Sequence, residues 1–477
     1  MGCVWSLLFY LLEVSDSRID FAKESNPSKP SGLLVTFAFG VTITGQFIMF
    51  QVGMVLIAFG VGEYPLAASS SAESSEVTDV MYRGRTVGLA FALQGWGNFV
   101  NTLMLLIMVY ATSVGNCVPN YDNAIQNTST CSDYNLSFSW RASYFVGMLF
   151  ILGMLVFRFG YLHESEIWKE RQDKMNHSDA KVREKETRSK QIRMLFCDPS
   201  YVFRLLGCSL SWAFVNVVFF GAMLFQSTLI SVTIGKQPSL VQIYSRILIN
   251  SAVSLVGYYV CAFTVDLEFF GRTRIQGFGF FVCTVLLLIC GFQYDYLTQN
   301  VVVFEVLYYI SSFFGQFGPN TTTFLLPTEL FPTEVVSLAN GIASASGKLG
   351  ALFATLLFSF GNKGTLVSAQ FMFVVNGFSS LAGLIVTVLF VPNAGRVTLH
   401  EVDRRFDCDL LGEKYEGPAT EAHNLSYFEV VYLYGIHEIF RFTSYKLSNK
   451  KSSKRKDSCK APINKDEQKE HSSLQIS

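Results

Sequence analysis

The feature that most constrains the fold of this chain is a succession of long apolar segments with few charged residues. A helix that spans a membrane needs about 20 consecutive, mostly apolar residues. By this criterion the sequence predicts about ten spans, at residues 32–46, 47–72, 86–113, 141–162, 201–230, 244–265, 276–293, 301–326, 336–361 and 368–391. The first two form one uncharged stretch from Ser31 to Gly62, so their division is the least defined. The sequence therefore predicts an all-α integral membrane protein that crosses a lipid bilayer several times.

Composition excludes several other classes of protein. Charged residues make up only 16% of the 477 residues, whereas soluble globular chains have about 25%. Lys and Arg balance Asp and Glu at 37 each, so no basic field favours nucleic acid. The ten cysteines are sparse and form no C-x-x-C pattern, which argues against a disulfide framework or a metal site. No cofactor or metal is expected.

The apolar segments and the polar stretches between them divide the chain into five regions. We expect an N-terminal stub at 1–30, an incomplete first transmembrane half at 31–162, a central polar loop at 163–200, a second transmembrane half at 201–391, and a largely disordered tail at 392–477. The tail carries a basic cluster from Lys450 to Lys456. Such a cluster can lie on anionic lipid or remain in solution.

Basic residues set the expected orientation. Arg83 and Arg85, the run from Lys169 to Arg193, and Arg272 with Arg274 all fall on one side when the spans alternate. Short basic loops stay in the cytoplasm. The central loop and the C-terminal tail are therefore predicted to be cytoplasmic.

The opposite side carries one long loop with features of an oxidising compartment. Asn127 and Asn135 begin glycosylation sequons in it. Cys117 and Cys131 share this loop and could form a disulfide there. These features are typical of the plasma membrane or of an endomembrane with a glycosylated lumenal face.

Five motifs, in order, resemble one family of transporters. They are Gly60–Ala67 (GVGEYPLA), Arg83-Gly84, Gln94–Gly97 (QGWG), Phe317–Phe324 (FGPNTTTF) and Ser346–Ala351 (SGKLGA). Together they resemble the phosphate:proton symporter family of the major facilitator superfamily, over roughly residues 55 to 392. The resemblance implies a twelve-helix bundle in two halves, with a mid-membrane site opened alternately to each side. On that plan the first two helices are missing; a truncated gene model and a reduced protein both account for this.

The resemblance also implies a binding site for an anion. Tyr64, Gln94, Trp212 and Asn320 match positions that contact phosphate in the family, although each alone is more often a packing residue. Lys348 matches a lysine near that site, and an ammonium within a span is a functional candidate by default. A lysine that neutralises a structural neighbour is the alternative.

Two positions on one span depart from the family pattern. Asn216 stands where the family has Asp, and Phe220 stands where it has Tyr. Asn216 remains a candidate substrate contact but cannot carry a proton. Glu63 replaces the family's Asp beside Tyr64, and we expect it to be the proton-coupling group.

Further residues match conformational motifs of the family. Arg83 and Glu329 are candidates for gating, as are Glu268 and Arg272 in a loop of the second half. Glu334 and Val336 stand where the family usually has arginines, so the salt bridges on the cytoplasmic side are weakened or rewired. We interpret the loop of Glu268 and Arg272 as a hinge.

Three functions remain in competition. The first is a secondary-active transporter for phosphate or a related organic phosphate or anion, with or without proton coupling, or for a polyol or sugar. The second is a non-transporting nutrient sensor or scaffold, favoured by Asn216 and by the long tail. A membrane enzyme is the weakest, because the sequence has no HExxH, GxSxG or Walker motif.

Overall fold

The structure of the chain is a computed structural model. It describes residues 82–112, 138, 142–143, 145–149, 152–153, 156, 178–224, 226, 230, 238–267, 269–360, 369–393, 397–411, 415 and 424–434. The predicted site residues Glu63, Tyr64, Cys117, Asn127, Cys131, Asn135 and Glu268 lie outside this part of the chain. The predicted spans 32–46 and 47–72 also lie outside it, and 141–162 is described only at scattered positions.

Seven helical segments in the described part are long and apolar enough to cross a membrane. They are α5 (Arg83–Ala111), α9 (Pro199–Leu224), α11 (Leu240–Thr264), α12 (Arg272–Phe292), the composite of α14 (Val301–Gly315), η4 (Gln316–Asn320) and α15 (Thr321–Leu330), α16 (Val336–Phe360) and α17 (Ala369–Phe390). A short helix, α13 (Tyr294–Gln299), joins α12 to α14. Seven of the predicted spans are thereby confirmed as helices.

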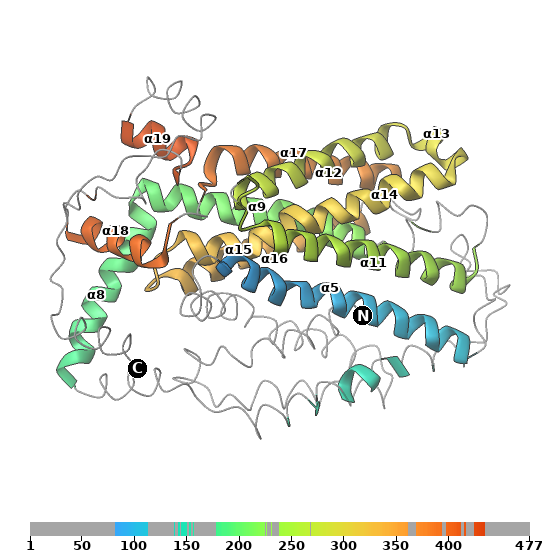
Figure 1. Cartoon of the computed structure of the whole chain (residues 1–477), viewed down its shortest axis with the longest axis horizontal. Helices are drawn as coiled ribbons and strands as arrows, with labels where there is room; N and C mark the ends of the chain where they lie inside the picture. Colours follow the sequence, from blue (N-terminus) through green and yellow to red (C-terminus); the bar gives the residue numbers. More distant parts are fainter. Residues whose placement is uncertain are drawn as a thin grey trace.

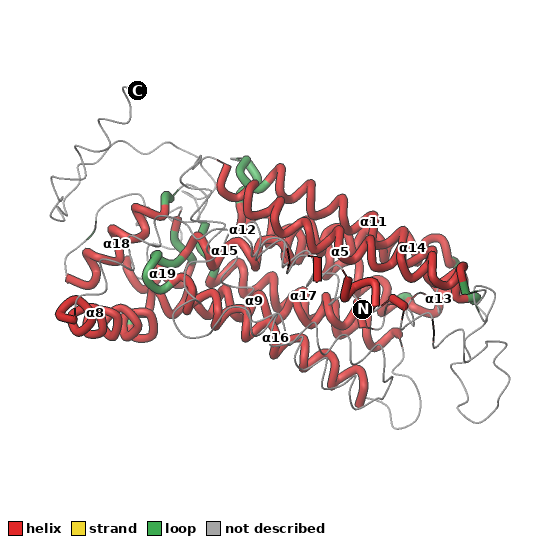
Figure 2. Tube along the Cα trace, turned by 90° about the horizontal axis from the view of Figure 1, so that it is seen from below, coloured by secondary structure: helices red, strands yellow, loops and turns green. Residues whose placement is uncertain are grey.

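These spans lie side by side as an elongated bundle (Figures 1 and 2). The main pairings place α16 along α9, α12 along α17, and α11 along α5. Small residues permit the closest approaches. A side chain at Gly350 of α16 would collide with the backbone carbonyl of Ala213 on α9. Glycine is therefore required where these two helices touch.

The surface of the bundle is apolar. Large side chains such as Phe292, Val302 and Leu349 are exposed on the spans, at 63%, 74% and 66% of their surface. Apolar patches of this extent are rare on soluble monomers. They suit a surface that faces lipid hydrocarbon.

One end of the bundle carries a buried cluster of charged residues. We call the end that carries Arg83, Arg272 and Glu329 the charged end. Three further helices lie there: α8 (Ser178–Cys197), α18 (Leu399–Leu411) and α19 (Tyr427–Tyr434) (Figure 1). The sequence predicts a largely disordered tail from 392, and the structure places α18 and α19 in its first part.

Helix α19 is fastened to the spans by a buried ion pair. Arg204 Nε on α9 donates to Glu429 Oε1 at 2.7 Å, and the side chains are 5% and 0% exposed. The Glu429 backbone N–H also donates to Ser426 Oγ at 3.2 Å, a helix-capping contact. Phe428 stacks on Phe390 of α17, with ring centres 4.6 Å apart.

The helix of the composite span is broken near its middle, and Pro319 explains the break. Proline has no N–H and its ring clashes with the preceding turn, and the chain adopts a π-helical turn, η4, at Gln316–Asn320. Three threonine hydroxyls donate to backbone carbonyls of this turn, at 2.7 to 2.9 Å: Thr321 to Gln316, Thr322 to Gly318, and Thr323 to Pro319. Such turns occur frequently at functional sites.

Candidate functional site

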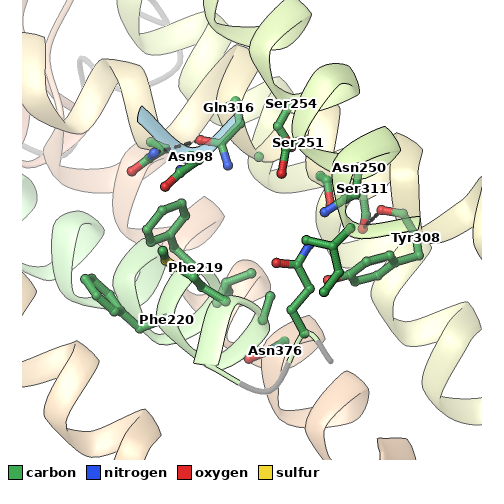
Figure 3. A pocket seen from close by; sticks show the side chains of 18 of the residues that line it. Asn98, Phe219, Phe220, Asn250, Ser251, Ser254, Tyr308, Ser311, Gln316 and Asn376 are labelled. Atoms are coloured by element: carbon green, nitrogen blue, oxygen red, sulfur yellow. Dashed lines mark hydrogen bonds between the residues drawn. The ribbon is translucent and has the colours of Figure 1, made fainter. Parts of the chain in front are cut away.

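A cavity of about 360 Å³ lies inside the bundle. It is lined from α5, α9, α11, α12, α14, η4 and α17 (Figure 3). Most of the lining residues lie in the halves of these helices that are remote from the charged end. Seven of the described lining residues carry amide side chains: Asn98, Asn101, Gln226, Asn250, Gln316, Asn320 and Asn376. Ser251, Ser254 and Ser311 add hydroxyl groups. The cavity is therefore polar although the spans around it are apolar.

Aromatic side chains form the remaining walls. Phe219 and Phe220 lie on α9, Tyr308 on α14 and Phe373 on α17. Figure 3 shows Phe219 and Phe220 on one side of the cavity and Tyr308 on another. Among the described residues that line the cavity there is no Asp, Glu, Lys, Arg or His. Hydrogen bonding and aromatic contact therefore dominate the chemistry of this lining.

The π-helical turn places Asn320 in the cavity wall. Asn320 Nδ2 donates to Gln316 Oε1 at 2.7 Å and to the Tyr258 hydroxyl at 2.8 Å. Tyr258 is buried on α11. These two bonds fix the amide of Asn320 at the point where α11 and the composite span meet.

An aromatic layer separates the cavity from the charged end. Phe91 of α5 stacks on Phe324 of α15 with ring centres 4.6 Å apart, and it meets the edge of Tyr258 at 5.6 Å. Trp212 of α9 meets Phe324 at 6.5 Å. Helices α5, α9, α11 and α15 all contribute rings to this layer.

Three cavity amides are incompletely hydrogen-bonded. The side-chain carbonyl oxygens of Asn98, Asn250 and Asn376 are buried, and none has a partner among the described residues. They come from α5, α11 and α17, so they face the cavity from three helices. A buried acceptor without a donor costs about 1–3 kcal/mol. These oxygens are therefore positions at which a bound molecule can donate hydrogen bonds.

The predicted binding residues fall into two groups. Asn320 lines the cavity, whereas Gln94, Trp212, Asn216 and Lys348 are not among its lining residues. Trp212 and Asn216 are buried. Both lie against α16, since a side chain at Gly347 would collide with them.

Gln94 and Lys348 lie next to the cavity. Gln94 is half-buried on α5, one turn before Asn98. Lys348 is exposed on α16, and its ammonium lies 5.6 Å from the centre of the Phe220 ring. Because Phe220 lines the cavity, the Lys348 ammonium lies close to one of its aromatic walls.

The amides of Asn98, Asn250 and Asn376 were not among the site residues predicted from the sequence. The available signal was an isolated Asn within an apolar span, which the sequence shows at each position. Such a residue can face a neighbouring helix, lipid or a cavity. Only the packing of the spans separates these cases.

A buried cluster of ion pairs holds the charged end together. Glu329 of α15 accepts from Arg83 Nε at 3.0 Å and from Arg272 Nε at 2.9 Å. Arg272 Nη2 also pairs with Asp266 Oδ1 at 2.6 Å. The side chain of Glu329 is fully buried, at 0% exposure. Arg83, Arg272 and Glu329, predicted as gating residues, are thus in contact with one another.

The cluster connects segments that are far apart in the sequence. Asp266 Oδ2 accepts from the backbone N–H of Arg85 at 2.6 Å, so α5 is held to the loop before α12 as well as to α15. Burial raises the pKa of the Asp266 carboxyl above its ordinary value, and Arg272 opposes that rise. Separation of α5 from α12 and α15 would break these contacts.

Solved structures of transporters share the fold. A double-tryptophan variant of XylE matches with a TM-score of 0.58 and 17% identity, over 85% of this chain and 87% of the other. A partially occluded, inward-open structure of the xylose transporter XylE from E. coli matches with a TM-score of 0.55 and 17% identity, over 83% of this chain and 88% of the other. At this identity the likeness concerns the fold alone.

Sequence relatives are named as phosphate transporters. The inorganic phosphate transporter PHO84 of Saccharomyces cerevisiae is 31% identical over 414 residues, which cover 75% of this chain and 67% of the relative. A repressible high-affinity phosphate permease of Neurospora crassa is 27% identical, over 80% of this chain and 74% of the relative. The family model of the sugar (and other) transporters matches residues 31–406. The chain therefore belongs to the sugar (and other) transporter family, within the major facilitator superfamily.

Proposed function

We propose that this chain is a secondary-active transporter that moves phosphate, or a related organic phosphate, across a membrane by alternating access. The observation that carries the proposal is a polar cavity within a bundle of spans, closed at one end by an aromatic layer and a buried ion-pair cluster. The names of the relatives support phosphate as the transported group.

The ion-pair cluster supports a gating role for Arg83, Glu329 and Arg272. Arg83 belongs to the first group of predicted spans, whereas Glu329 and Arg272 belong to the second. When the two groups separate at the charged end, Glu329 keeps Arg272 and loses Arg83. A gate of this kind holds in one state and is released in the other.

The distribution of basic residues supports a cytoplasmic location for the charged end. Arg83, Arg85, Arg272 and Arg274 all lie there, at the beginnings of α5 and α12. Positive charge near short loops is retained in the cytoplasm. On this orientation the cavity lies in the half of the bundle nearer the non-cytoplasmic side. The glycosylation sites Asn127 and Asn135 and the disulfide of Cys117 with Cys131 remain predictions on that side.

Proton coupling would fall to Glu63. Asn216 cannot exchange a proton at neutral pH, and no charged side chain is among the described residues that line the cavity. Glu63 precedes Tyr64 in the motif that resembles the family, and Lys348 would favour the anion from α16.

The test is uptake of labelled phosphate by cells that lack their own phosphate transporters and express this chain. Uptake should rise with an inward proton gradient, and Glu63→Gln should abolish that rise. Lys348→Ala should weaken uptake with or without the gradient. If the chain reaches the membrane and no phosphate compound enters in either condition, the proposal is wrong and a sensor of the same fold is the better account.

A further inference from the structure

The cavity is larger than inorganic phosphate requires. Its volume of about 360 Å³ corresponds to the liquid volume of about twelve water molecules, at roughly 30 Å³ each. Phosphate is an ion of five non-hydrogen atoms. A substrate that fills the cavity therefore has an organic part in addition to a phosphate group.

The lining suits a neutral, hydroxylated group better than an anion. An anion buried without a nearby cation or a full set of donors is costly, and the described lining residues include no cation. Amide side chains instead offer donors and acceptors in equal measure, as Asn98, Asn250 and Asn376 do here. Hydroxyl groups have the same dual character.

The three unpartnered oxygens require donors from the bound molecule. Dihydrogen phosphate has two O–H groups on one small ion. The cavity has three such oxygens, one each from Asn98 on α5, Asn250 on α11 and Asn376 on α17, which is one more than the O–H groups of dihydrogen phosphate. A polyhydroxylated chain or ring can present separate O–H groups to all three helices.

The aromatic walls add a surface for C–H groups. Phe219, Phe220, Tyr308 and Phe373 line the same space (Figure 3). One face of a sugar ring is apolar enough to pack on such rings. Lys348 lies next to Phe220, 5.6 Å from its ring centre, and it supplies a positive charge that the described lining residues do not contain.

We propose that the transported substrate is a phosphate ester of a polyhydroxylated compound. Its hydroxylated part binds in the cavity to Asn98, Asn250 and Asn376, and its phosphate group lies toward Lys348. The proposal rests on the proposed function and narrows the substrate from phosphate compounds in general to polyol or sugar phosphates.

The experiment compares three labelled probes in proteoliposomes that contain the purified full chain: inorganic phosphate, glucose 6-phosphate and free glucose. Glucose 6-phosphate should reach half-maximal uptake at a concentration at least about tenfold lower than inorganic phosphate does. A tenfold ratio equals about 1.4 kcal/mol, the order of one hydrogen bond.

Variants of the cavity amides test whether the preference for glucose 6-phosphate over inorganic phosphate arises in the cavity. Asn98→Leu, Asn250→Leu and Asn376→Leu keep a side chain of similar length and remove its hydrogen bonds. Each should raise the half-saturation concentration for glucose 6-phosphate about tenfold and change that for phosphate less than threefold. Asn340→Leu is the matched control, because Asn340 is buried on α16 and is not a lining residue; it should not alter the ratio.

Thermal unfolding of each purified variant confirms that it is folded, and a shift of the melting temperature by glucose 6-phosphate gives a second readout of binding. Phosphate uptake without any effect of glucose 6-phosphate would overturn this inference and leave the proposed function intact. It would also be overturned if the Leu variants raised the half-saturation concentrations for glucose 6-phosphate and for phosphate equally. Uptake of free glucose alone would overturn both proposals.

Discussion

At the scale of single residues, Glu329 is the most consequential side chain of the charged end. Its carboxylate is fully buried and receives two guanidinium groups, from Arg83 and Arg272. Loss of the carboxylate would leave two buried guanidinium groups without one of the negative charges that neutralise them.

Glu329→Gln should therefore destabilise the protein strongly. Removal of one partner from a buried ion pair costs about 3–5 kcal/mol. The measurement is thermal unfolding of the purified protein in detergent. Glu305→Gln is the matched control, because its partner Arg246 is 45% exposed and such a screened pair contributes about 0–1 kcal/mol. Equal effects of the two substitutions would contradict the account of the cluster.

The titration of Asp266 should make the stability of the folded protein depend on pH. Burial raises its pKa in the folded chain, so the folded state binds a proton more readily than the unfolded state does. The corresponding stability is present at low pH and is lost as the pH rises through the raised pKa.

Between pH 7 and pH 4, the wild-type protein should therefore gain stability relative to Asp266→Asn, which does not titrate. Unfolding midpoints of both proteins over this range test the sign. The difference in unfolding midpoint between the two proteins could instead stay constant, or shift in favour of the Asn variant on acidification. Either result would show that the pKa of Asp266 is not raised.

At the scale of elements, the broken span positions the site. The turn η4 directs Gln316 and Asn320 into the cavity, and Pro319 prevents the chain from closing into a regular α-helix there. The threonines that follow hydrogen-bond to the carbonyls of the turn.

Pro319→Ala should therefore impair substrate binding more than folding. An Ala at this position restores an N–H and permits a regular helix, which would rotate Asn320 away from Tyr258. The half-saturation concentration for uptake should rise about tenfold or more. Pro327→Ala is the control, because Pro327 also lies inside a helix but is not a lining residue. Similar uptake by both variants would argue against a positioning role of η4.

The positions of most of the described spanning helices could be predicted from the sequence, for a physical reason. A span must satisfy its backbone hydrogen bonds internally, so apolar length alone predicts helices such as 276–293, observed as Arg272–Phe292. The π-helical turn could not be predicted in this way, because a proline within a span is compatible with a kink, a break or a bulge. Among the candidate site residues, Asn320 was identified only through its motif.

The face on which a polar residue lies was the least predictable property. Asn98 and Asn250 face the cavity, whereas Asn216, which the sequence analysis named, lies against Gly347 of α16. Helical periodicity does not resolve this, because apolar residues surround each isolated polar residue on these spans. Contacts between helices decide the face, and they depend on which spans become neighbours.

At the scale of the whole molecule, the structure is one state of an alternating-access cycle. At the charged end the ion-pair cluster joins α5 to α15, and the cavity lies in the other half of the bundle. Opening of the charged end requires α5 to part from α15, and Arg83 opposes that movement only in the closed state.

Arg83→Ala should shift the population toward a state that is open at the charged end. A coupling of about 1–3 kcal/mol corresponds to a 5- to 150-fold change in the ratio of states. Cys261 of α11 is buried and has a free thiol, so its labelling by a polar maleimide, followed by mass spectrometry, reports the opening.

Arg274→Ala is the control for this experiment. Arg274 lies at the same end, and its Nη1 donates to the Phe269 carbonyl at 3.0 Å, outside the Glu329 network. Its substitution should leave the labelling of Cys261 unchanged. Unchanged labelling in Arg83→Ala as well would show that the ion pair does not hold the gate.

The central claim is that this chain carries phosphate compounds across a membrane by itself, and the most direct test is exchange in proteoliposomes. Vesicles that contain the purified chain and unlabelled phosphate are placed in labelled phosphate, without any ion gradient. We predict that label accumulates above the level in protein-free vesicles, that external glucose 6-phosphate competes with it, and that Lys348→Ala reduces it. A folded protein that exchanges no label, with phosphate or with glucose 6-phosphate inside the vesicles, would contradict the account.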